Sequence, residues 1–420
     1  MFNTTSSAPR PGTDTPGPSY TEQVLARAGD GAIDPVLGRF YRIPALLDLG
    51  GGITLAAYDG RPDGADSPSP NSIIQRRSTD NGVSWGMPIF VARGQMPADG
   101  VERYGFSDPS YVFDEETGDV FLFFVHSRDV SFQDGGFGCG DADRTITGAV
   151  VAVSRDQGLS WSTDPAHLLA GPLAGPVTGS KFADYAGPLV TAAVKPVGST
   201  VGGVKNVAGV AGVFASSGQG IQLKYGTYKG RLLQQFVGKV KQADGTTEYQ
   251  AYGVYSDDHG RTWRRGEFTG AGMDENKSVE LSNGDVMLNS RASRGGAGGR
   301  KVAISRDGGH SYGPVTVDSV LVDPINNASI TRMYPHAPQG SAEAKLLLFS
   351  HANSTAEREN GTIRLSADDG VTWNEGTQFK AGAMAYSTMA ALSDGTFGIF
   401  YEGDGNELVF GKFNAAWLGS

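Results

Sequence analysis

The sequence contains a single cysteine and no long hydrophobic run. Cys139 can form no disulfide within the chain, and no grouping of histidines and cysteines has the spacing of a structural metal site. No stretch reaches the roughly 18 consecutive apolar residues of a transmembrane helix. Residues 1–30 are rich in Thr, Ser, Pro and Gly and lack the apolar segment of a signal peptide. These absences argue against a disulfide-stapled fold and against anchoring by membrane-spanning helices.

Positive charge is also scarce relative to negative charge. The chain has 35 Lys and Arg against 45 Asp and Glu, a formal net charge of −10. No basic run or zinc-ligand spacing appears, so nothing in the sequence indicates nucleic-acid binding. Glycine, by contrast, is abundant at 61 of 420 residues, about twice its usual share. Such a composition is typical of a fold with a turn every eight to twelve residues or so.

A short pattern, Ser-x-Asp-x-Gly-x-x-aromatic, occurs five times. The copies begin at Ser78, Ser154, Ser256, Ser305 and Ser366. Four of the five tryptophans occupy the aromatic position, and Tyr312 fills it in the fourth copy. We expect the Asp to accept backbone N–H bonds across a turn, the Gly to supply a positive φ, and the aromatic ring to fold over the hairpin. Each copy follows an apolar run, which predicts a hairpin leaving a buried strand.

The spacing of these copies predicts the fold. They recur at intervals of about 50 to 100 residues, the size of a propeller blade with or without an insertion. We therefore predict an all-β fold, a six-bladed β-propeller of four-stranded antiparallel blades. A disordered polar leader is expected over 1–32, a single propeller domain over 33–420, and an insertion at about 163–216. The N-terminal strands are expected to complete the sixth blade with strands within 389–413, which closes the ring.

An arginine interrupts the first apolar strand. Arg42 lies in Phe-Tyr-Arg-Ile-Pro, and burying its charge costs free energy unless an anion meets it. By itself, Arg42 could equally be a charge at a strand edge. Tyr-Arg-Ile-Pro near the start of a propeller, followed by several Asp-box repeats, resembles the sialidases (exo-α-neuraminidases), and the secreted bacterial branch most closely. The resemblance covers about residues 38–419.

The resemblance implies three catalytic residues. Tyr386, in Met-Ala-Tyr-Ser-Thr, matches the nucleophile motif of the family. Glu275 resembles the glutamate that hydrogen-bonds the nucleophile, with Glu280 as the competing residue of the same segment. Asp66, in a Gly/Pro/Asp-rich loop, resembles the general acid/base. Composition alone does not distinguish Asp66 from the other aspartates nearby.

Three arginines are implied as ligands of a substrate carboxylate. They are Arg42, Arg291 and Arg364, with Arg332 as a rival for the third position. Guanidinium groups bind a carboxylate through two parallel, charge-assisted hydrogen bonds, which lysine cannot reproduce. A trio of arginines drawn from separate blades suits a sugar that carries its carboxylate on the anomeric carbon.

Three further residues are implied at the site. Arg61 resembles an arginine that contacts a sugar hydroxyl, and Glu402 resembles the carboxylate that braces Arg42. Asp108 resembles a residue that lines the pocket near the glycerol and acetamido groups, although an Asp-Pro turn explains it equally well.

These residues suit retaining hydrolysis of terminal α-linked sialic acid from glycoproteins, glycolipids and oligosaccharides through a covalent tyrosyl intermediate. A neutral phenol can approach a carbon whose own carboxylate would repel an attacking carboxylate, and sialidases are exceptions to the two-carboxylate scheme for this reason. Glu275 would accept the phenol proton and Asp66 would protonate the leaving oxygen. The alternatives are a trans-sialidase or intramolecular trans-sialidase and, in another class, a non-catalytic sialic-acid-binding propeller.

No cofactor and no catalytic metal are expected. The expected partners are sialylated glycans, without nucleic acid or a membrane span, and the expected state is a monomer. The resemblance to secreted bacterial enzymes implies an extracellular location. Since the given chain shows no signal peptide, either the signal was removed or the protein stays inside the cell.

Overall fold

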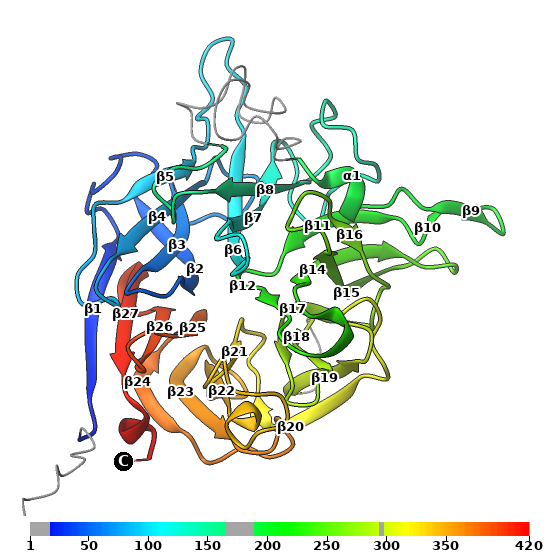
Figure 1. The fold of residues 1–420 in the computed structure, drawn as a ribbon. Coiled ribbons are helices and arrows are strands. Elements are labelled where there is room, and N and C mark those ends of the chain that lie inside the picture. Colours follow the sequence, from blue (N-terminus) through cyan, green and yellow to red (C-terminus); the bar gives the residue numbers. More distant parts are fainter. Residues whose placement is uncertain (1–16, 164–188, 294–297, 420) are drawn as a thin grey trace, which may run out of the picture.

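The computed structural model describes residues 17–163, 189–293 and 298–419. Six sheets surround a central axis in a ring (Figure 1). The predicted six-bladed β-propeller of small antiparallel sheets is therefore confirmed. We number the blades from 1 to 6 in chain order.

The strands of blades 1 to 3 have the following bounds. Blade 1 contains β2 (Phe40–Asp48), β3 (Thr54–Arg61), β4 (Ser72–Ser78) and β5 (Ile89–Ala92); blade 2 contains β6 (Gly105–Phe113), β7 (Val120–Ser127), β8 (Gly148–Ser154) and the short β12 (Gly218–Gln219); blade 3 contains β11 (Val210–Ala215), β13 (Ile221–Gln222), β14 (Leu232–Lys241), β15 (Thr247–Ser256) and β16 (Arg264–Arg265).

Blades 4 to 6 follow the same plan. Blade 4 contains β17 (Met273–Glu280), β18 (Val286–Ala292), β19 (Gly299–Ser305) and β20 (Thr316–Val322); blade 5 contains β21 (Ser329–Arg332), β22 (Leu347–Ala352), β23 (Glu359–Ser366) and β24 (Thr377–Ala383); blade 6 contains β25 (Ser387–Ala391), β26 (Phe397–Glu402), β27 (Glu407–Phe413) and β1 (Tyr20–Arg27). The described helices are short: α1 (Thr191–Val194), η1 (Gly226–Tyr228), η2 (Glu343–Lys345), η3 (Asp404–Asn406) and η4 (Ala415–Gly419).

The ring is closed by both ends of the chain. The outer strand of blade 6 is β1, which pairs with β27 from Tyr20 opposite Phe413 to Arg27 opposite Glu407 (Figure 1). The prediction of a disordered leader over 1–32 is thus wrong for β1. The sequence does not predict this strand because half of its side chains are exposed and its sequence lacks apolar alternation; pairing with β27 stabilises it instead.

The predicted insertion at about 163–216 lies partly outside the described residues. Its described part holds α1 and a two-stranded hairpin of β9 (Ser199–Val201) and β10 (Val204–Val207). The last six residues before Ser216 form β11, which pairs with β14 and belongs to blade 3. The insertion therefore ends before the predicted boundary, because an apolar Val/Ala/Gly strand was counted with it.

The Asp-box repeats have the predicted turn geometry. In the first box, Ser78 Oγ donates to Asp80 Oδ1 at 2.7 Å, and Asp80 accepts the Ser84 N–H at 2.8 Å and the Ser84 hydroxyl at 2.5 Å. Equivalent bonds occur in the other four boxes. Hydrogen bonds from Ser84, and then from Ser78, lower the pKa of Asp80 to about 2. The carboxylate is therefore a structural acceptor that stays ionised.

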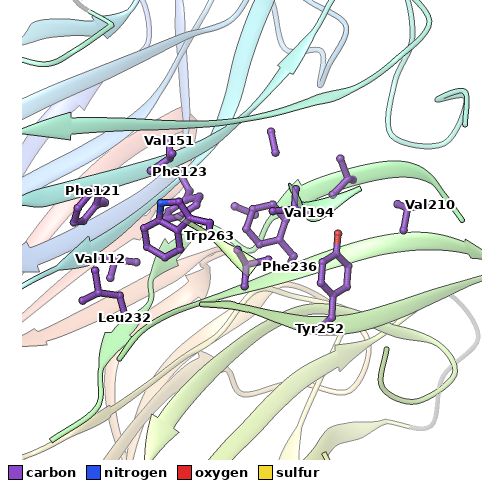
Figure 2. Close-up of a cluster of buried hydrophobic side chains, with 14 of the residues drawn as sticks. Val112, Phe121, Phe123, Val151, Val194, Val210, Leu232, Phe236, Tyr252 and Trp263 are labelled. Carbon is purple, nitrogen blue, oxygen red and sulfur yellow. The ribbon is translucent and has the colours of Figure 1, made fainter. Parts of the chain in front are cut away.

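The box glycines also connect neighbouring blades. Each has a positive φ, and a Cβ built on it would lie 2.1 to 2.8 Å from a side chain of the preceding blade. The pairs are Gly82 with Phe410, Gly158 with Leu55, Gly260 with Phe121, Gly309 with Leu233, and Gly370 with Met287. Figure 2 shows the third junction, where Trp263 of blade 3 lies against Phe121 and Phe123 of blade 2, with ring centroids 5.6 and 4.7 Å apart. The repeat therefore joins blades as well as closing hairpins.

We expect Gly260→Ala to lower the free energy of unfolding by roughly 2–4 kcal/mol. Its φ is +75°, which is strained for alanine, and the new Cβ would lie 2.1 Å from the Phe121 ring. Gly245→Ala is the matched control. Gly245 also has a positive φ, +91°, but a Cβ built on it would meet nothing within 4 Å, so this variant measures the backbone strain without a clash. Chemical denaturation of both variants measures the difference, and equal losses would contradict packing between the blades.

The direction of the strands separates the two ends of the central axis. The inner strands β2, β6, β17, β21 and β25 contact one another around the axis. Their final residues, such as Leu47, Phe113, Glu280 and Arg332, line one cavity of about 140 Å³. The first residues of these inner strands therefore meet at the opposite end of the axis. Because neighbouring strands within a blade are antiparallel, the second strand of a blade ends there and the third strand begins there. That end gathers most of the residues predicted for the site.

Candidate active site

A buried tyrosine and a buried glutamate form the centre of the site. Tyr386 directly precedes β25, and its hydroxyl donates to Glu275 Oε1 of β17 at 2.6 Å. Arg291, near the end of β18, donates from Nη1 to the same Tyr386 oxygen at 3.0 Å. Burial raises the pKa of Tyr386, and Glu275 raises it further, whereas Arg291 and Arg42 oppose the rise. The free phenol is therefore neutral, and it already has a proton acceptor within hydrogen-bond distance.

Arg291 is held by two carboxylates of β17. Its Nη2 lies 3.0 Å from Asp274 Oδ2, and its Nη1 lies 3.5 Å from Glu275 Oε1. The Arg291 Nε is buried and has no hydrogen-bond partner in the described structure, and neither has Glu275 Oε2. A buried guanidinium with an unused donor can accept an anionic ligand at low cost, since its desolvation has already occurred on folding.

Arg42 is braced as the sequence predicts. At the start of β2, its Nε lies 3.2 Å from Glu402 Oε1 and its Nη2 lies 3.3 Å from Glu402 Oε2. Glu402, the last residue of β26, also accepts the Ile43 N–H at 2.8 Å. Glu402 is the largest cause that raises the pKa of Arg42, so this guanidinium stays charged. It lies 5.2 Å from the centre of the Tyr386 ring, next to the nucleophile candidate.

Asp66 lies at the rim of the same cluster. Its side chain is 76% exposed, and its Oδ1 lies 2.7 Å from Arg61 Nη1 and 3.4 Å from Arg42 Nη1. Burial alone would raise the pKa of Asp66, but Arg61, Arg42 and Arg358 together hold it below its usual value. Asp66 is therefore ionised in the free protein at neutral pH.

Arg61, predicted to contact a sugar hydroxyl, lies beside Asp66 in the cluster. Its side chain is 1% exposed, and its Nη2 lies 2.8 Å from Asp59 Oδ2. Its Nη1 donates to the Ala65 carbonyl at 3.1 Å as well as to Asp66. Arg61 thus supports the loop that carries Asp66, because a buried guanidinium at the end of β3 must donate its hydrogen bonds to nearby carboxylates and carbonyls.

Asp108 lies beside this pair at the bulge of β6. It has a positive φ of 64°, and its N–H donates to Asp59 Oδ1 at 3.1 Å. Burial raises the pKa of Asp108 well above its usual value, and the nearby Asp59 and Glu275 raise it further. Asp108 is therefore in the cluster and not merely a turn-initiating residue.

Arg364 requires a correction. The structure does not bring Arg364 to the cluster, since its guanidinium contacts His351 Nε2 at 3.2 Å, the Asn374 carbonyl at 2.6 Å and Asn353 Oδ1 at 3.3 Å. The rival Arg332 lies at the other end of the axis, 3.5 Å from Glu280. Arg364 is predicted because it lies just before the last Asp box in sequence, a criterion that ignores the end of the strand at which a residue lies.

Arg358 takes the place predicted for Arg364. It directly precedes β23, donates from Nη2 to the Ile325 carbonyl at 2.8 Å, and lies 5.3 Å from the centre of the Tyr386 ring. It also lowers the pKa values of Tyr386 and Asp66. No motif in the sequence marks Arg358 or the bracing carboxylates Asp59 and Asp274 as site residues. Assigning each arginine to the start or end of its strand would have identified Arg358.

No metal site accompanies this cluster. Within residues 17–163, 189–293 and 298–419, no group of three or more His, Cys, Asp or Glu side chains could hold a metal ion.

The helices of this described part are all too short, or too polar, to cross a membrane.

The fold and this cluster define a six-bladed propeller with an arginine-rich pocket around a tyrosine and a glutamate. The family model named BNR repeat-like domain matches residues 54–399, and the chain belongs to this family. A sialidase of Micromonospora viridifaciens is 49% identical over 402 residues, which are 96% of this chain and 55% of that relative. The chain thus spans little more than half of that relative. The predicted resemblance to bacterial sialidases is confirmed.

Solved structures show the same fold at lower identity. The Hadza microbial sialidase Hz136 superposes with a TM-score of 0.75 and 24% identity, covering 94% of this chain and 69% of that chain. The intramolecular trans-sialidase from Ruminococcus gnavus gives a TM-score of 0.71 and 19% identity, covering 93% of this chain and 97% of that chain. The propeller is therefore shared by a protein named a sialidase and by a protein named an intramolecular trans-sialidase.

Proposed function

We propose that the chain is a retaining exo-sialidase that hydrolyses terminal α-linked sialic acid from glycoconjugates. The observation that carries this proposal is the contact of Tyr386 with Glu275 at 2.6 Å, surrounded by Arg42, Arg291 and Arg358. The 49% identity to a protein named sialidase supports the substrate class. A lectin would need the arginines, but it would need neither a nucleophile nor its base.

The three arginines suit a substrate that carries a carboxylate at its reacting carbon. Arg42 and Arg291 are each oriented by a buried carboxylate, Glu402 and Asp274 respectively. Fixed guanidinium groups can bind the substrate carboxylate without first being reorganised. The substrate would then lie with its anomeric carbon above the Tyr386 oxygen.

The same contacts suit a tyrosyl intermediate. As Tyr386 Oη bonds to the anomeric carbon, its proton would pass to Glu275 Oε1, and Arg291 would stabilise the developing negative charge on the phenol oxygen. The bond from the anomeric carbon to the leaving oxygen breaks in this step, and that oxygen takes a proton from Asp66. In the second step, Asp66 would take a proton from water while the water oxygen bonds to the anomeric carbon. The bond from that carbon to Tyr386 Oη would break, and Tyr386 would take its proton back from Glu275.

Asp66 can donate a proton only if its pKa rises when the substrate binds. In the free protein, Arg61, Arg42 and Arg358 hold this pKa low. A substrate carboxylate that binds Arg42 and Arg358 would neutralise part of that positive charge, and an aglycone over the exposed Asp66 would exclude water. We therefore expect the substrate itself to turn Asp66 into an acid.

The test is release of 4-methylumbelliferone from its α-sialoside by the unmodified chain, with proton NMR of the sugar first released. We expect the α-anomer, which is net retention after two displacements at the anomeric carbon. The β-anomer as first product would exclude the covalent intermediate. An anhydro sugar formed without water would indicate intramolecular transfer. Binding of sialic acid without any release would leave the non-catalytic propeller.

A further inference from the structure

A turn between blades 4 and 5 lies at the catalytic end of the axis and takes no part in the proposed reaction. It runs from Asp323 to Ala328, between β20 and β21. Its residue Asn326 is almost fully buried, and the side-chain Nδ2 donates to the Ala385 carbonyl at 2.7 Å. Ala385 directly precedes Tyr386, so this bond holds the peptide group that leads into the proposed nucleophile.

The peptide group between Ala385 and Tyr386 is held on both of its edges. Asn326 contacts the carbonyl oxygen, and the N–H, which belongs to Tyr386, donates to Glu402 Oε2 at 3.4 Å. Glu402 is the carboxylate that braces Arg42. Because a peptide group is planar, contacts on both edges fix the direction in which the backbone enters Tyr386. The orientation of the tyrosine therefore depends on the turn between blades 4 and 5.

The backbone of Asn326 is itself fixed by an ion pair. The Asn326 N–H donates to Asp323 Oδ1 at 2.8 Å, and the Asn326 carbonyl accepts a hydrogen bond from Arg300 Nη1 at 2.8 Å. Arg300 and Asp323 are almost fully buried, and Arg300 Nη1 lies 3.3 Å from Asp323 Oδ2. Arg300 also donates from Nε to Asn289 Oδ1 of β18 at 2.8 Å. A residue held at both backbone groups can support a neighbour at little further cost in conformational entropy.

The preceding residue of the turn contacts the arginine nearest in sequence to β23. The Ile325 carbonyl accepts the hydrogen bond from Arg358 Nη2 at 2.8 Å. Ile325 has a positive φ of 59°, which is strained for a β-branched residue. Ile43, which directly follows Arg42, has a similar φ of 63°. Strain of this kind persists only where the surrounding contacts determine the backbone, and it is typical of functional sites.

We propose that Asn326 is a positioning residue, which holds Tyr386 in contact with Glu275 and Arg291 by fixing the Ala385 carbonyl. This inference rests on the proposed function. In this role Asn326 touches neither the substrate nor the reacting atoms, and it acts on the reaction only through the placement of the nucleophile. Misplacing a reacting group by about 1 Å can lower a rate about 100-fold, so a single bond to the backbone is enough to affect kcat.

Asn326→Leu tests this role, because leucine has a similar shape and no donor. The Ala385 carbonyl then loses its partner, and we expect kcat on the 4-methylumbelliferyl α-sialoside to fall about 10- to 100-fold. KM should stay within about threefold, since Arg42 and Arg291 keep the carboxylates that orient them. Asn326→Asp removes the same donor and should show the same loss, which keeps the test available if the leucine variant does not fold. Thermal unfolding checks the folding of both variants.

The matched control is Asn327→Leu. Asn327 is the next residue of the turn and is also buried, but its Nδ2 donates to Ser217 Oγ at 2.8 Å, and its Oδ1 accepts from Lys277 Nζ at 3.0 Å. Neither contact is made with the peptide group before Tyr386, so kcat should stay within about threefold of the unmodified chain. Equal losses of kcat in Asn326→Leu and Asn327→Leu would indicate general damage to the turn and overturn the proposal. A loss in Asn326→Leu that appears only in KM would overturn it as well.

A second measurement does not depend on turnover. In protein labelled with carbon-13 at the tyrosine ring carbon that bears the hydroxyl, the Tyr386 signal, assigned by its absence in Tyr386→Phe, reports the hydrogen bonds of the phenol. We expect Asn326→Leu to move this signal and Asn327→Leu to leave it in place. An unmoved signal in Asn326→Leu would exclude the positioning role even in an active enzyme. A moved signal in a protein whose unmodified chain releases no sugar would overturn the proposed function and retain the positioning of Tyr386.

Discussion

Replacing Tyr386 by phenylalanine is expected to lower kcat by about 10³-fold or more on a 4-methylumbelliferyl α-sialoside. The change removes one oxygen, which receives the Arg291 donor at 3.0 Å and donates to Glu275 at 2.6 Å. The ring remains, so its packing under Arg42 and Arg358 persists. Without the oxygen, no bond to the anomeric carbon can form, and Glu275 receives no proton.

Tyr255→Phe is the matched control for this prediction. Tyr255 of blade 3 is also buried, and its hydroxyl contacts Nδ1 of His310, in the turn between β19 and β20 of blade 4, at 3.1 Å. Its loss should leave kcat within about twofold of the unmodified chain. Binding of free sialic acid should survive in Tyr386→Phe, which separates chemistry from recognition. A Tyr386→Phe variant that keeps a tenth of the activity would exclude the tyrosine as nucleophile.

The repeat made the fold predictable from sequence. Five Asp boxes with a reserved aromatic position indicate hairpins at regular places, and the structure puts each box at the end of one strand of blades 1 to 5, namely β4, β8, β15, β19 and β23. The outer strand of blade 6, β1, was not predictable from periodicity, since its exposed side chains carry no alternation. Such a strand is determined by backbone pairing with a partner almost 400 residues away.

The site was predictable where a motif identified the residue. Tyr386, Glu275 and Arg291 meet in space although they lie in three strands or strand ends of two blades. Residues without a motif, such as Asp59 and Asp274, were not predictable, because their role depends on which guanidinium lies beside them after folding. Both pairings lie within a single blade, Asp59 with Arg61 in blade 1 and Asp274 with Arg291 in blade 4, and a linear pattern does not show which side chains meet after folding.

Replacing Arg358 by alanine is expected to reduce kcat/KM by roughly 30- to 100-fold, whereas Arg364→Ala should stay within about threefold. The two arginines lie six residues apart, and both are partly exposed. Because strand direction assigns the start of β23 to the catalytic end of the axis, Arg358 lies 5.3 Å from the Tyr386 ring, and Arg364 instead contacts His351 and Asn374.

At the pH where kcat/KM is highest, the loss in Arg358→Ala should appear mainly as a higher KM, because the arginine binds the carboxylate in both the ground state and the transition state. It should also move the pKa of Asp66 upward, since Arg358 is one of the three cations that hold this pKa low. The measurement is kcat/KM for both variants from pH 4 to 8, about the range in which these groups titrate. Equal losses in the two variants, or a larger loss in Arg364→Ala, would restore Arg364 as the third carboxylate ligand and require the loop before β23 to rearrange when substrate binds.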